Sequence, residues 1–410
     1  MAVKIADPLL MREINKYHVL ETIRCHGQIS RVEISERTML SGTTVSAITG
    51  ALIEEGLIEA IHAPLNGETQ RGRPRVLLGL VSDAAYVLGI QISETMTTLA
   101  LVDFRGELVS SAQLPIRLAR QPADVIADLI EDAMDDCITR SGVDPKRIKG
   151  IGIGVPGIVD PRSGKSYSST VFGEREVPIA ALLQERTGLP VKLEKPANLL
   201  ALAESWFGHA QTDHSFAVVV LDQTASLSLW VEADLHRGAS TLGPTFGHIK
   251  VGGEGTICDC GQTDCLNTYV STTAMRQRAT SALGSAFVDS PTARADLPSA
   301  IAAAAKAGSN AAQSLIEEQG SKLGIGVSHV INLFNPEKII VALESPQYCE
   351  AVAPSVRAAA AANSFHAHFA TTELIFHPLD DQLWARGAAA LMLRDIYSAP
   401  WTPAYQEERQ

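Results

Sequence analysis

Cysteine, aromatic residues and long apolar runs are all scarce in this sequence. Only 6 of the 410 residues are cysteine, and 5% are Phe, Trp or Tyr. So few cysteines exclude a disulfide framework, and no apolar run approaches the roughly eighteen residues that a membrane span needs. The first residues also lack the basic start, apolar core and cleavage site of a secretory signal. We therefore expect a cytoplasmic protein with reduced thiols and no membrane association.

Positive charge is in short supply as well. The net charge is −12, which argues against a protein coated in nucleic acid. The imbalance is uneven, because residues 1–80 contain nine basic and nine acidic residues and the rest of the chain carries the whole excess. A neutral module on an acidic body can bind DNA only through the local placement of its arginines. The length and the 46% of hydrophobic residues predict two or three globular domains.

Half of the few cysteines stand together with a histidine. His248, Cys258, Cys260 and Cys265 follow the order His-x9-Cys-x-Cys-x4-Cys. Four thiolate and imidazole ligands are the donor set of a closed, tetrahedral structural zinc site. Four glycines between the histidine and the last cysteine let the backbone fold tightly enough for the ligands to converge. We predict a structural Zn²⁺ site here, against the alternative of three scattered cysteines and a surface histidine.

The first eighty residues have the pattern of a helix-turn-helix. Apolar residues at helical spacing predict a helix over Met11–Arg24. Ser30 with Glu33 forms a capping box that opens a short helix, Arg31–Thr38. A turn at 40–42 precedes a longer helix, Thr43–Glu55. Two helices joined by a short glycine-containing turn are the helix-turn-helix unit, whose second helix enters the major groove of DNA.

Small, hydroxyl-bearing residues distinguish the outer face of the second helix, and they can approach phosphates and base edges closely. The residues expected on that face are Thr43, Thr44, Ser46, Ala47 and Thr49. Arg31, at the start of the preceding helix, is also a candidate DNA contact. The residues expected in the buried stripe are Val45, Ile48, Leu52 and Ile53.

A hairpin wing and an arginine segment follow these helices. Strands are predicted over Leu57–Ala63 and Val76–Val81, on either side of an Asn-Gly turn at 66–67. Arg71 and Arg73, within Arg-Gly-Arg-Pro-Arg, are slender enough to enter a narrow A·T minor groove. A solvated basic linker is the alternative for this segment, and a protein-docking module is the alternative for the helix pair. Together the helices, wing and arginines predict binding to double-stranded DNA.

The remainder of the chain has the pattern of a duplicated α/β architecture. Alternating strands begin at Tyr86, followed by a helix over Pro122–Ser141 and a buried strand over Ile148–Val155. A second comparable set of strands begins at Phe216. The segment 152–157 matches G-x-G-x-x-G after a strand, but its proline and the extended residues beyond it provide no helix N-terminus for a pyrophosphate. We therefore do not predict dinucleotide binding.

At this point the chain resembles the ROK family, which contains repressors, open reading frames and sugar kinases, and above all its repressor branch. The resemblance covers nearly the whole chain. It rests on TTVSAITGALIEEGLI with RGRPR, GIGVPGIVD, PANLLALAESWFG, GHIKV…CDCGQTDCL and INLFNPEKIIV. It implies an α/β fold, with a winged helix-turn-helix followed by a duplicated actin-like, ribonuclease H-like sugar-kinase body.

The resemblance also implies domain boundaries. Residues 1–82 would be the DNA-binding domain with its arginine linker, and residues 83–200 the first α/β lobe, completed by a C-terminal helix at 380–397. Residues 201–379 would form the second lobe, with the zinc site and an oligomerisation surface.

Departures from the kinase pattern predict that the body is not catalytic. Family kinases begin with an Asp-x-Gly-Gly-Thr phosphate loop, but residues 91–95 are Gln-Ile-Ser-Glu-Thr, without glycines and with a repelling carboxylate. The family's catalytic aspartate corresponds to Pro196, which cannot act as a general base. The two glycine-rich nucleotide segments correspond to residues 222–228 and 344–345, which have lost their glycines.

The sugar site implied by the resemblance is also altered. Two family glutamates correspond to Thr245 and Asn267, while His248 keeps its type and Lys195 adds a cation. The candidate effector contacts are Lys195, Asn198, Thr245, His248 and Asn267. Because carboxylates that bind sugar hydroxyls are replaced by neutral and cationic groups, we expect an anionic effector such as a sugar acid or sugar phosphate. An eroded pocket without any ligand is the alternative.

His248 would serve both the metal and the effector pocket. One ring nitrogen would bind zinc while the other meets a sugar hydroxyl, so that a ligand could move the metal loop and signal to the DNA-binding helices. The plainer alternative is that zinc only holds the loop.

The sequence therefore predicts a transcriptional regulator, in the first place a repressor, of carbohydrate-related genes. It would bind a two-fold operator as a homodimer or homotetramer. The alternatives are a ROK-type sugar kinase fused to a DNA-binding domain and a ligand-independent regulator with a dead pocket.

Overall fold

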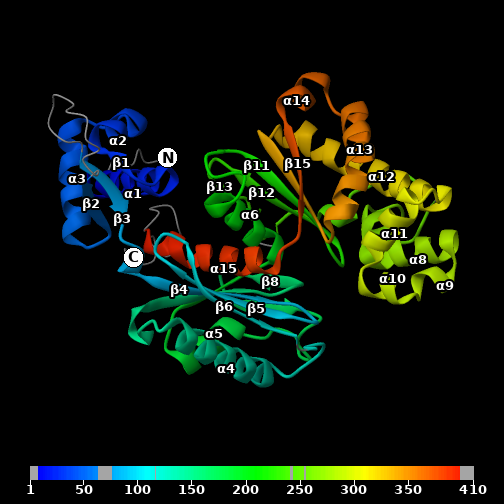
Figure 1. The fold of residues 1–410 in the computed structure, drawn as a ribbon, viewed down its shortest axis with the longest axis horizontal. Coiled ribbons are helices and arrows are strands. Elements are labelled where there is room, and N and C mark those ends of the chain that lie inside the picture. Colours follow the sequence, from blue (N-terminus) through cyan, green and yellow to red (C-terminus); the bar gives the residue numbers. More distant parts are fainter. Residues whose placement is uncertain (1–7, 63–75, 116, 241–242, 254, 398–410) are drawn as a thin grey trace. The chain divides into compact units, whose positions relative to one another are not determined.

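Two five-stranded sheets with the same strand order organise the chain (Figure 1). The computed structural model describes residues 8–62, 76–115, 117–240, 243–253 and 255–397. These residues form two units, one running to Gln211 and including the chain from Trp384 onward, the other spanning Thr212–Leu383. The expected duplicated α/β fold is confirmed, because each unit has one sheet with three antiparallel strands followed by two parallel ones.

The first unit begins with the winged helix-turn-helix. Its helices are α1 (Pro8–His26), α2 (Arg31–Thr38) and α3 (Gly42–Glu54). A small sheet in the order β1-β3-β2 consists of β1 (Ile29–Ser30), β2 (Ile58–His62) and β3 (Val76–Leu80). The predicted capping box is confirmed: the Ser30 hydroxyl accepts from the backbone N–H of Glu33 at 3.3 Å, and the Glu33 carboxylate accepts from that of Ser30 at 3.0 Å.

Three details of α3, the second helix of the helix-turn-helix, differ from the prediction. Thr49 is fully buried rather than on the outer face, because its hydroxyl accepts a hydrogen bond from Arg31 Nε at 2.9 Å. Ile53 is 37% exposed and does not belong to the buried stripe, which consists of Val45, Ile48 and Leu52. The turn before α3 reverses at Met39, which adopts a left-handed φ of 57°, while Gly42 already starts the helix.

The two strands of the predicted wing are confirmed and pair in antiparallel register. The Asn-Gly turn at 66–67 and the arginines Arg71 and Arg73 lie outside the described residues.

The first α/β sheet has the order β10-β7-β4-β5-β6. Its strands are β4 (Tyr86–Ile92), β5 (Thr97–Asp103), β6 (Leu108–Leu114), β7 (Ile148–Gly154) and β10 (Val191–Glu194). The helices of this lobe are α4 (Ala123–Ser141), α5 (Ile179–Thr187), α6 (Pro196–Phe207) and α15 (Asp381–Ile396). A hairpin of β8 (Ile158–Asp160) and β9 (Lys165–Ser168) accompanies them. The helix and strand predicted at 122–141 and 148–155 are confirmed to within a residue.

Helix α15 packs so closely against this sheet that the two backbones are in direct contact. A Cβ on Gly89 would lie 1.8 Å from the carbonyl oxygen of Ala385, and a Cβ on Gly152 equally close to that of Ala388. Gly387 of α15 meets α6 in the same way, since its Cβ would lie 2.0 Å from the carbonyl oxygen of Leu199. Glycine is required at these positions because any side chain would push the helix off the sheet or off α6.

The second unit has a sheet in the order β13-β12-β11-β14-β15. Its strands are β11 (Phe216–Leu221), β12 (Ala225–Val231), β13 (Asp234–Leu235), β14 (Lys338–Leu343) and β15 (Glu373–Pro378). The main helices are α8 (Thr272–Leu283), α11 (Leu297–Lys306), α12 (Asn310–Phe334) and α13 (Pro346–Asn363). Shorter helices are α7 (Asn267–Val270), α9 (Ser285–Val288), α10 (Pro291–Ala295) and α14 (His366–Thr371). Sheet and helices share one apolar core.

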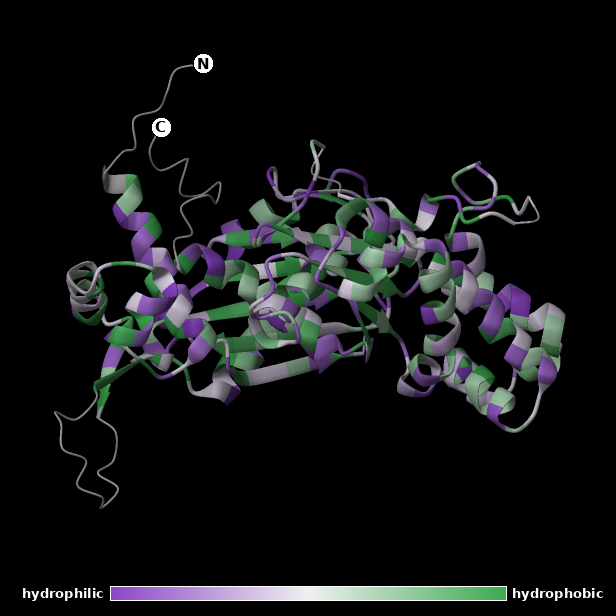
Figure 2. Cartoon of the chain, turned by 90° about the horizontal axis from the view of Figure 1, so that it is seen from above, coloured by the Kyte–Doolittle hydropathy of each residue, from purple (hydrophilic) through white to green (hydrophobic). Residues whose placement is uncertain are grey.

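Hydropathy follows this layering. The strands inside each unit are mainly hydrophobic and hydrophilic residues gather on the outer helices and loops (Figure 2). Strand β11, for example, is buried along its whole length, as expected for a central strand covered on both faces. Among the described residues, no helix is both long and apolar enough to span a bilayer.

Candidate metal centre and DNA-binding surface

The side chains of His248, Cys258, Cys260 and Cys265, here called the His-Cys cluster, converge in the second unit. Their four ligand atoms all lie within 4.8 Å of one another. Cys258 Sγ is 3.5 Å from His248 Nδ1, and Cys260 Sγ is 3.7 Å from Cys265 Sγ. Three thiols and an imidazole at these separations are a donor set suited to a single tetrahedral zinc ion.

Short backbone bridges bring the four ligands together. Lys250 pairs with Cys265, which folds the histidine segment against the last cysteine. Between Cys258 and Gln262 a tight turn forms, with the Cys258 N–H donating to the Gln262 carbonyl at 2.7 Å. Gly261, inside that turn, has a φ of 83°, which a residue with a side chain rarely adopts. The glycines that the sequence analysis noted thus serve the turns of the cluster.

Asp264 is a structural residue of this loop that the sequence analysis missed. Its carboxylate accepts from the backbone N–H of Gly255 at 2.9 Å, from that of Thr256 at 3.2 Å and from the Tyr269 hydroxyl at 3.3 Å. It therefore holds the loop before Cys258 in place without being a ligand. The signal in the sequence was a single acidic residue next to Cys265, which does not distinguish a loop brace from a solvated side chain.

The two thiols at the end of the cluster differ in electrostatic environment. Burial raises the pKa of the Cys265 thiol to about 11, whereas a hydrogen bond from the Gln262 backbone lowers the pKa of Cys260. Lys250 Nζ lies 3.7 Å from Cys265 Sγ and brings a positive charge to the thiolates. A bound cation deprotonates coordinating thiols outright, so binding of a metal here would release protons.

The candidate DNA-binding face lies on α3. Thr43, Ser46 and Ala47 are exposed, and Thr44 is half-buried. The Thr44 hydroxyl lies 2.8 Å from that of Ser41, which caps the helix, so it is partly engaged within the protein. Arg31 is bound to α3 through its hydrogen bond to Thr49. Small exposed groups on a well-capped helix are suited to close approach to a duplex.

Helix α1 contributes to the same surface, which sequence reasoning did not find. A hollow of about 590 Å³ is lined by Arg12 and Lys16 of α1 together with Thr43, Thr44 and Ala47 of α3. Lys16 is held by Glu55 in a surface ion pair at 2.7 Å. Periodicity marked α1 only by its apolar face, and the placement of its polar face beside α3 depends on helix packing.

The predicted effector residues belong to different units. Lys195 and Asn198 lie at the start of α6 in the first unit, and Thr245, His248 and Asn267 lie in the second. Asn198 is 1% exposed, and its amide donates to the Glu194 carboxylate at 2.9 Å. The same carboxylate accepts from the Lys195 backbone N–H at 3.0 Å. Glu194, itself 1% exposed, is a second residue that the sequence analysis missed.

Asn267 is also engaged by the fold. Its side-chain oxygen accepts from the backbone N–H of Ala225 at 2.8 Å, and Gly247 packs directly against its amide. Thr245 is exposed and precedes the short turn that carries His248. In the second unit the exposed imidazole and the Thr245 hydroxyl are therefore more accessible to a ligand than Asn267.

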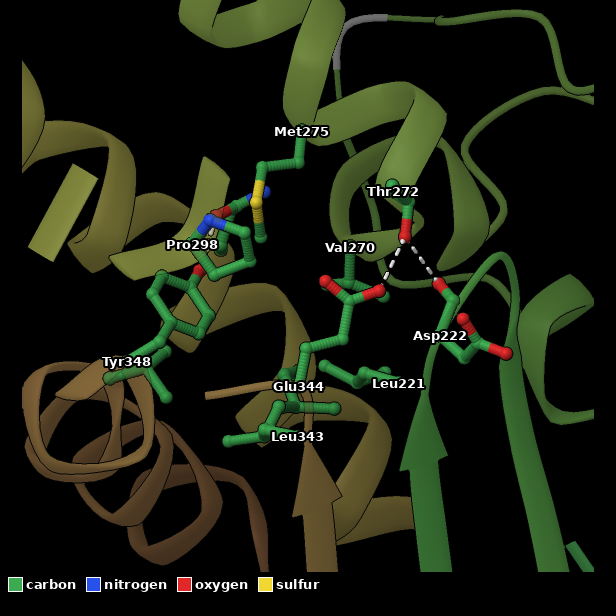
Figure 3. A pocket seen from close by; sticks show the side chains of 12 residues that line it. Leu221, Asp222, Val270, Thr272, Met275, Pro298, Leu343, Glu344 and Tyr348 are labelled. Atoms are coloured by element: carbon green, nitrogen blue, oxygen red, sulfur yellow. Dashed lines mark hydrogen bonds between the residues drawn. The ribbon is translucent and has the colours of Figure 1, made fainter. Parts of the chain in front are cut away.

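Asp222 and Glu344 line one pocket at the carboxyl ends of β11 and β14 (Figure 3). They belong to the segments that the sequence resemblance aligns with the nucleotide loops of family kinases. The pocket measures about 20 Å³, close to the space of a single water molecule. Thr272 donates to the Asp222 carbonyl at 2.9 Å and lies 3.3 Å from the Glu344 carboxylate (Figure 3). Burial, with the charge of Asp222, raises the pKa of Glu344 from 4.5 to about 7. The remaining walls are mostly apolar and include Leu343, and Tyr348 closes one side.

Comparison with known proteins agrees with this architecture. Residues 12–59 match a winged helix-turn-helix DNA-binding family, and residues 87–395 match the ROK family. The chain is 28% identical over 396 residues to the xylose repressor of Caldicellulosiruptor bescii, covering 95% of this chain and 98% of that protein. It is 25% identical over 391 residues to the DNA-binding transcriptional dual regulator NagC of Escherichia coli, covering 95% of both.

Solved structures extend the comparison. A ROK family transcriptional regulator, described as a homologue of the E. coli MLC protein, superposes with a TM-score of 0.78 at 25% identity, over 95% of this chain and 97% of that chain. A ROK family glucokinase from Streptomyces griseus, in complex with glucose and AMPPNP, shares the fold of 75% of this chain and 99% of its own, with a TM-score of 0.60 and 24% identity. The match over residues 87–395 shows that this chain belongs to the ROK family, with a winged helix-turn-helix domain before the ROK body.

Proposed function

We propose that this protein is a transcriptional repressor of carbohydrate-related genes whose ROK body senses a metabolite without catalysing a reaction. The observation that carries the proposal is the combination in one chain of a winged helix-turn-helix with a ROK body. Several positions of that body differ from the pattern of the family's kinases. The xylose repressor and NagC, which are similar over 95% of this chain, support a regulatory function. We place the protein in the cytoplasm, where its operator would be.

Three places in the body support a function without kinase activity. Pro196 occupies the first position of α6, where family kinases have their catalytic aspartate, and it has no group that can accept a proton. The Gln91 side chain, at the position of the phosphate-loop aspartate, is buried and donates to the Ile92 carbonyl at 3.0 Å. The pocket at β11 and β14 has room for about one water and is lined by the acidic residues Asp222 and Glu344, which disfavour a bound phosphate.

For the His-Cys cluster we propose one structural Zn²⁺ ion. The convergence of the four ligand atoms within 4.8 Å supports it. The ion would fasten the loop that carries Thr245 and His248 to the segment around Cys265. The zinc-bound loop would also transmit a ligand signal if His248 binds both the zinc ion and the effector.

For DNA we propose that Thr43, Thr44, Ser46 and Ala47 read the major groove, that Arg31 contacts a phosphate, and that Arg71 and Arg73 enter the minor groove. A homodimer or homotetramer would place two copies of α3 on DNA half-sites that lie about one turn of the DNA helix, or a multiple of it, apart. The exposure of Thr43, Ser46 and Ala47 on a capped helix supports this arrangement.

Genomic footprinting with the full-length protein tests the proposal directly. We expect a small set of two-fold sites beside carbohydrate-related genes, and release of the protein from these sites by a metabolite. Sugar-dependent turnover of ATP by the purified protein would instead establish the kinase alternative. Operator affinity indifferent to every metabolite would establish the ligand-independent alternative.

For the effector we propose an anionic sugar derivative. Its candidate contacts are Lys195 and Asn198 in the first unit, and Thr245, His248 and Asn267 in the second. The cation at Lys195 and the neutral residues at 245 and 267 support it. Isothermal titration should compare xylose, N-acetylglucosamine, a sugar acid and a sugar phosphate. Tight binding of either neutral sugar would overturn the anionic proposal, and heat from none of the four would favour an eroded pocket.

A further inference from the structure

Helix α6 ends against the DNA-binding domain. The last carbonyls of a helix have no partner within the helix and must be satisfied from outside. Here Arg24, on α1, donates from Nη1 to the Trp206 carbonyl at 3.2 Å and from Nη2 to the Ser205 carbonyl at 3.5 Å. Its guanidinium also stacks over the Trp206 indole, 4.4 Å from the ring centroid. Arg24 therefore caps α6 from another domain.

This contact is buried and electrostatically complete. The Arg24 side chain is 5% exposed, and Glu21 neutralises it through two bonds of 2.6 and 2.8 Å. A cation at the negative end of a helix dipole is further stabilised. An arginine held this tightly between two domains fixes the orientation of α1 more strictly than an exposed ion pair would.

The end of α6 is itself held rigidly. The Glu204 carboxylate, 1% exposed, accepts from the backbone N–H of His209 at 2.7 Å, and Gly208 packs directly against that carboxylate. The Trp206 indole also contacts the Tyr397 ring edge-on, with 5.1 Å between the two ring centroids. The two carbonyls that Arg24 reaches therefore keep their direction when α6 moves as a body.

The other end of α6 holds two of the candidate effector contacts. Lys195 occupies the N-cap position without a side-chain capping bond, and Asn198 is bound to Glu194. Ten of the twelve residues of α6 are buried, and Gly387 of α15 touches its backbone at Leu199. A buried helix of this length spans about 18 Å and shifts as a rigid element, so a displacement at its start reaches its end.

Arg105 forms a second contact between the DNA-binding domain and the first lobe, and a hollow lies between this contact and Arg24. Arg105 holds the end of β3 by donating from Nε to the Leu80 carbonyl at 2.8 Å. Between Arg24 and Arg105 lies a hollow of about 200 Å³, whose walls include Gly27 and Gly79. Because the space between Arg24 and Arg105 is not fully packed, one of these two contacts can shift relative to the other without overlap of atoms.

We propose that Arg24 is a positioning residue for operator binding, and that α6 transmits displacements from Lys195 and Asn198 through Arg24 to the DNA-binding helices. The direction of signalling rests on the proposed function, because it requires an effector at the start of α6. The mechanical link between the two ends of α6 does not require it and can be tested without DNA or effector.

Hydrogen exchange on the full-length protein tests the link. Asn198→Ala breaks the bond to Glu194 at the start of α6, and we expect faster exchange of α1 amides as well as of α6 amides. Arg24→Met keeps the apolar stem on Trp206 but removes the cap. It should raise exchange in the last turn of α6 by about tenfold, as expected for losing hydrogen bonds from a charged donor. In Arg24→Met, the further change Asn198→Ala should no longer affect α1.

Arg140→Met is the matched control, because Arg140 is half-exposed on α4 and forms a surface pair with Asp136. It should leave exchange of α1 and α6 unchanged. If Asn198→Ala does not fold, Lys195→Ala replaces it at the adjoining position. Faster exchange confined to α6, with α1 unchanged, would overturn the proposal.

Operator affinity, measured by fluorescence anisotropy on fragments recovered by footprinting, gives the second readout. Asn198→Ala should change the affinity in the wild-type background and have no effect in Arg24→Met, whereas a purely structural Arg24 would give additive effects. Failure of the wild-type protein to bind any fragment would refute the proposed function, while hydrogen exchange would still decide the link through Arg24.

Discussion

At the scale of single residues, the fold uses several polar side chains that the sequence suggests for ligands. Asn198 is bound to Glu194, and Asn267 accepts from Ala225. Thr49, expected to face DNA, accepts from Arg31. Buried polar groups need such partners because an unpaired one costs on the order of 1–3 kcal/mol. The type of a residue therefore suggests a function, while its partner decides how much of the side chain remains for a ligand.

Cys260→Ser tests the metal ion. Removing one of four ligands should lower the zinc content from about one ion per chain to well below that, and should lower the melting temperature. Zinc by mass spectrometry and thermal unfolding measure the two effects. Cys349→Ser is the control, because this buried thiol lies outside the His-Cys cluster and its replacement should reduce stability with zinc retained. A zinc-free wild-type protein with normal stability would contradict the site.

Glu344→Gln tests the carboxylate beside Asp222. The pKa of Glu344 is raised from 4.5 to about 7, so the folded state binds its proton more tightly than the unfolded state. Stability from this group is present below pH 4.5 and is lost as the pH rises toward 7. The variant avoids that loss, and its melting temperature should exceed that of the wild type more at about pH 8 than at about pH 5. Glu350→Gln, an exposed position on α13, should show no such trend.

At the scale of elements, local signals and close packing have separate effects. The capping box of Ser30 and Glu33 starts α2, which begins and ends at the predicted residues. The contact of α15 with α6 and the first sheet depends instead on glycines that let backbones touch. No periodicity marks these glycines, because their requirement comes from a neighbouring element rather than from their own helix or strand.

Ser30→Ala tests the capping box of α2. Loss of the side-chain acceptor should lower the free energy of unfolding of the DNA-binding domain by about 1 kcal/mol. Chemical denaturation followed by hydrogen exchange of α2 amides measures it. Ser46→Ala, on the exposed face of α3, should change stability by less than about 0.5 kcal/mol. Equal effects of the two variants would contradict a specific contribution from the cap.

Gly387→Ala tests the crossing of α6 and α15. Because the new Cβ would lie 2.0 Å from the Leu199 carbonyl oxygen, the helices must separate, at a cost of about 1–3 kcal/mol or more. Gly50→Ala on α3 is the control, since no atom lies within 4 Å of its Cβ position. That substitution should be neutral or stabilising by up to about 1 kcal/mol. A stable Gly387→Ala protein would show that the crossing tolerates a wider separation.

At the scale of the whole molecule, the same sheet topology occurs in both units, and the C-terminal helix α15 completes the first of them. Both sheets have three antiparallel strands followed by two parallel ones. The chain leaves the first unit after Gln211 and re-enters it at Trp384, so α15 completes a lobe begun nearly three hundred residues earlier. The net charge of −12 belongs to these two lobes rather than to the DNA-binding domain.

Operator binding should depend strongly on salt in spite of this acidic body. Phosphate contacts release counterions, so the affinity should fall steeply with salt concentration. Arg71→Ala with Arg73→Ala should weaken binding and reduce the salt slope by about one to two units. Titrations at several salt concentrations measure this, with Arg140→Ala on α4 as the control. An unchanged slope would assign these arginines to a solvated linker.

Much of the protein could be predicted because the decisive signals are local. The capping box, the Cys-x-Cys-x4-Cys spacing and the strand patterns from Tyr86 each lie within a short window of the chain. The sequence by itself thus determined the family, the winged helix-turn-helix and the duplicated α/β body. Residues such as Arg12, Glu194 and Asp264 escaped prediction because a lone charged residue has the same pattern whether it braces a loop or meets solvent.

Only the tertiary structure decided how these parts act together. It brought the four ligand atoms of the His-Cys cluster within 4.8 Å, buried Thr49 and placed Arg24 on the end of α6. The reason is physical: hydrogen bonds, ion pairs and ring stacking extend over a few ångströms in space, whatever the separation in sequence. Arg24 and Trp206 are 182 residues apart in the chain, and packing of the folded domains makes them neighbours.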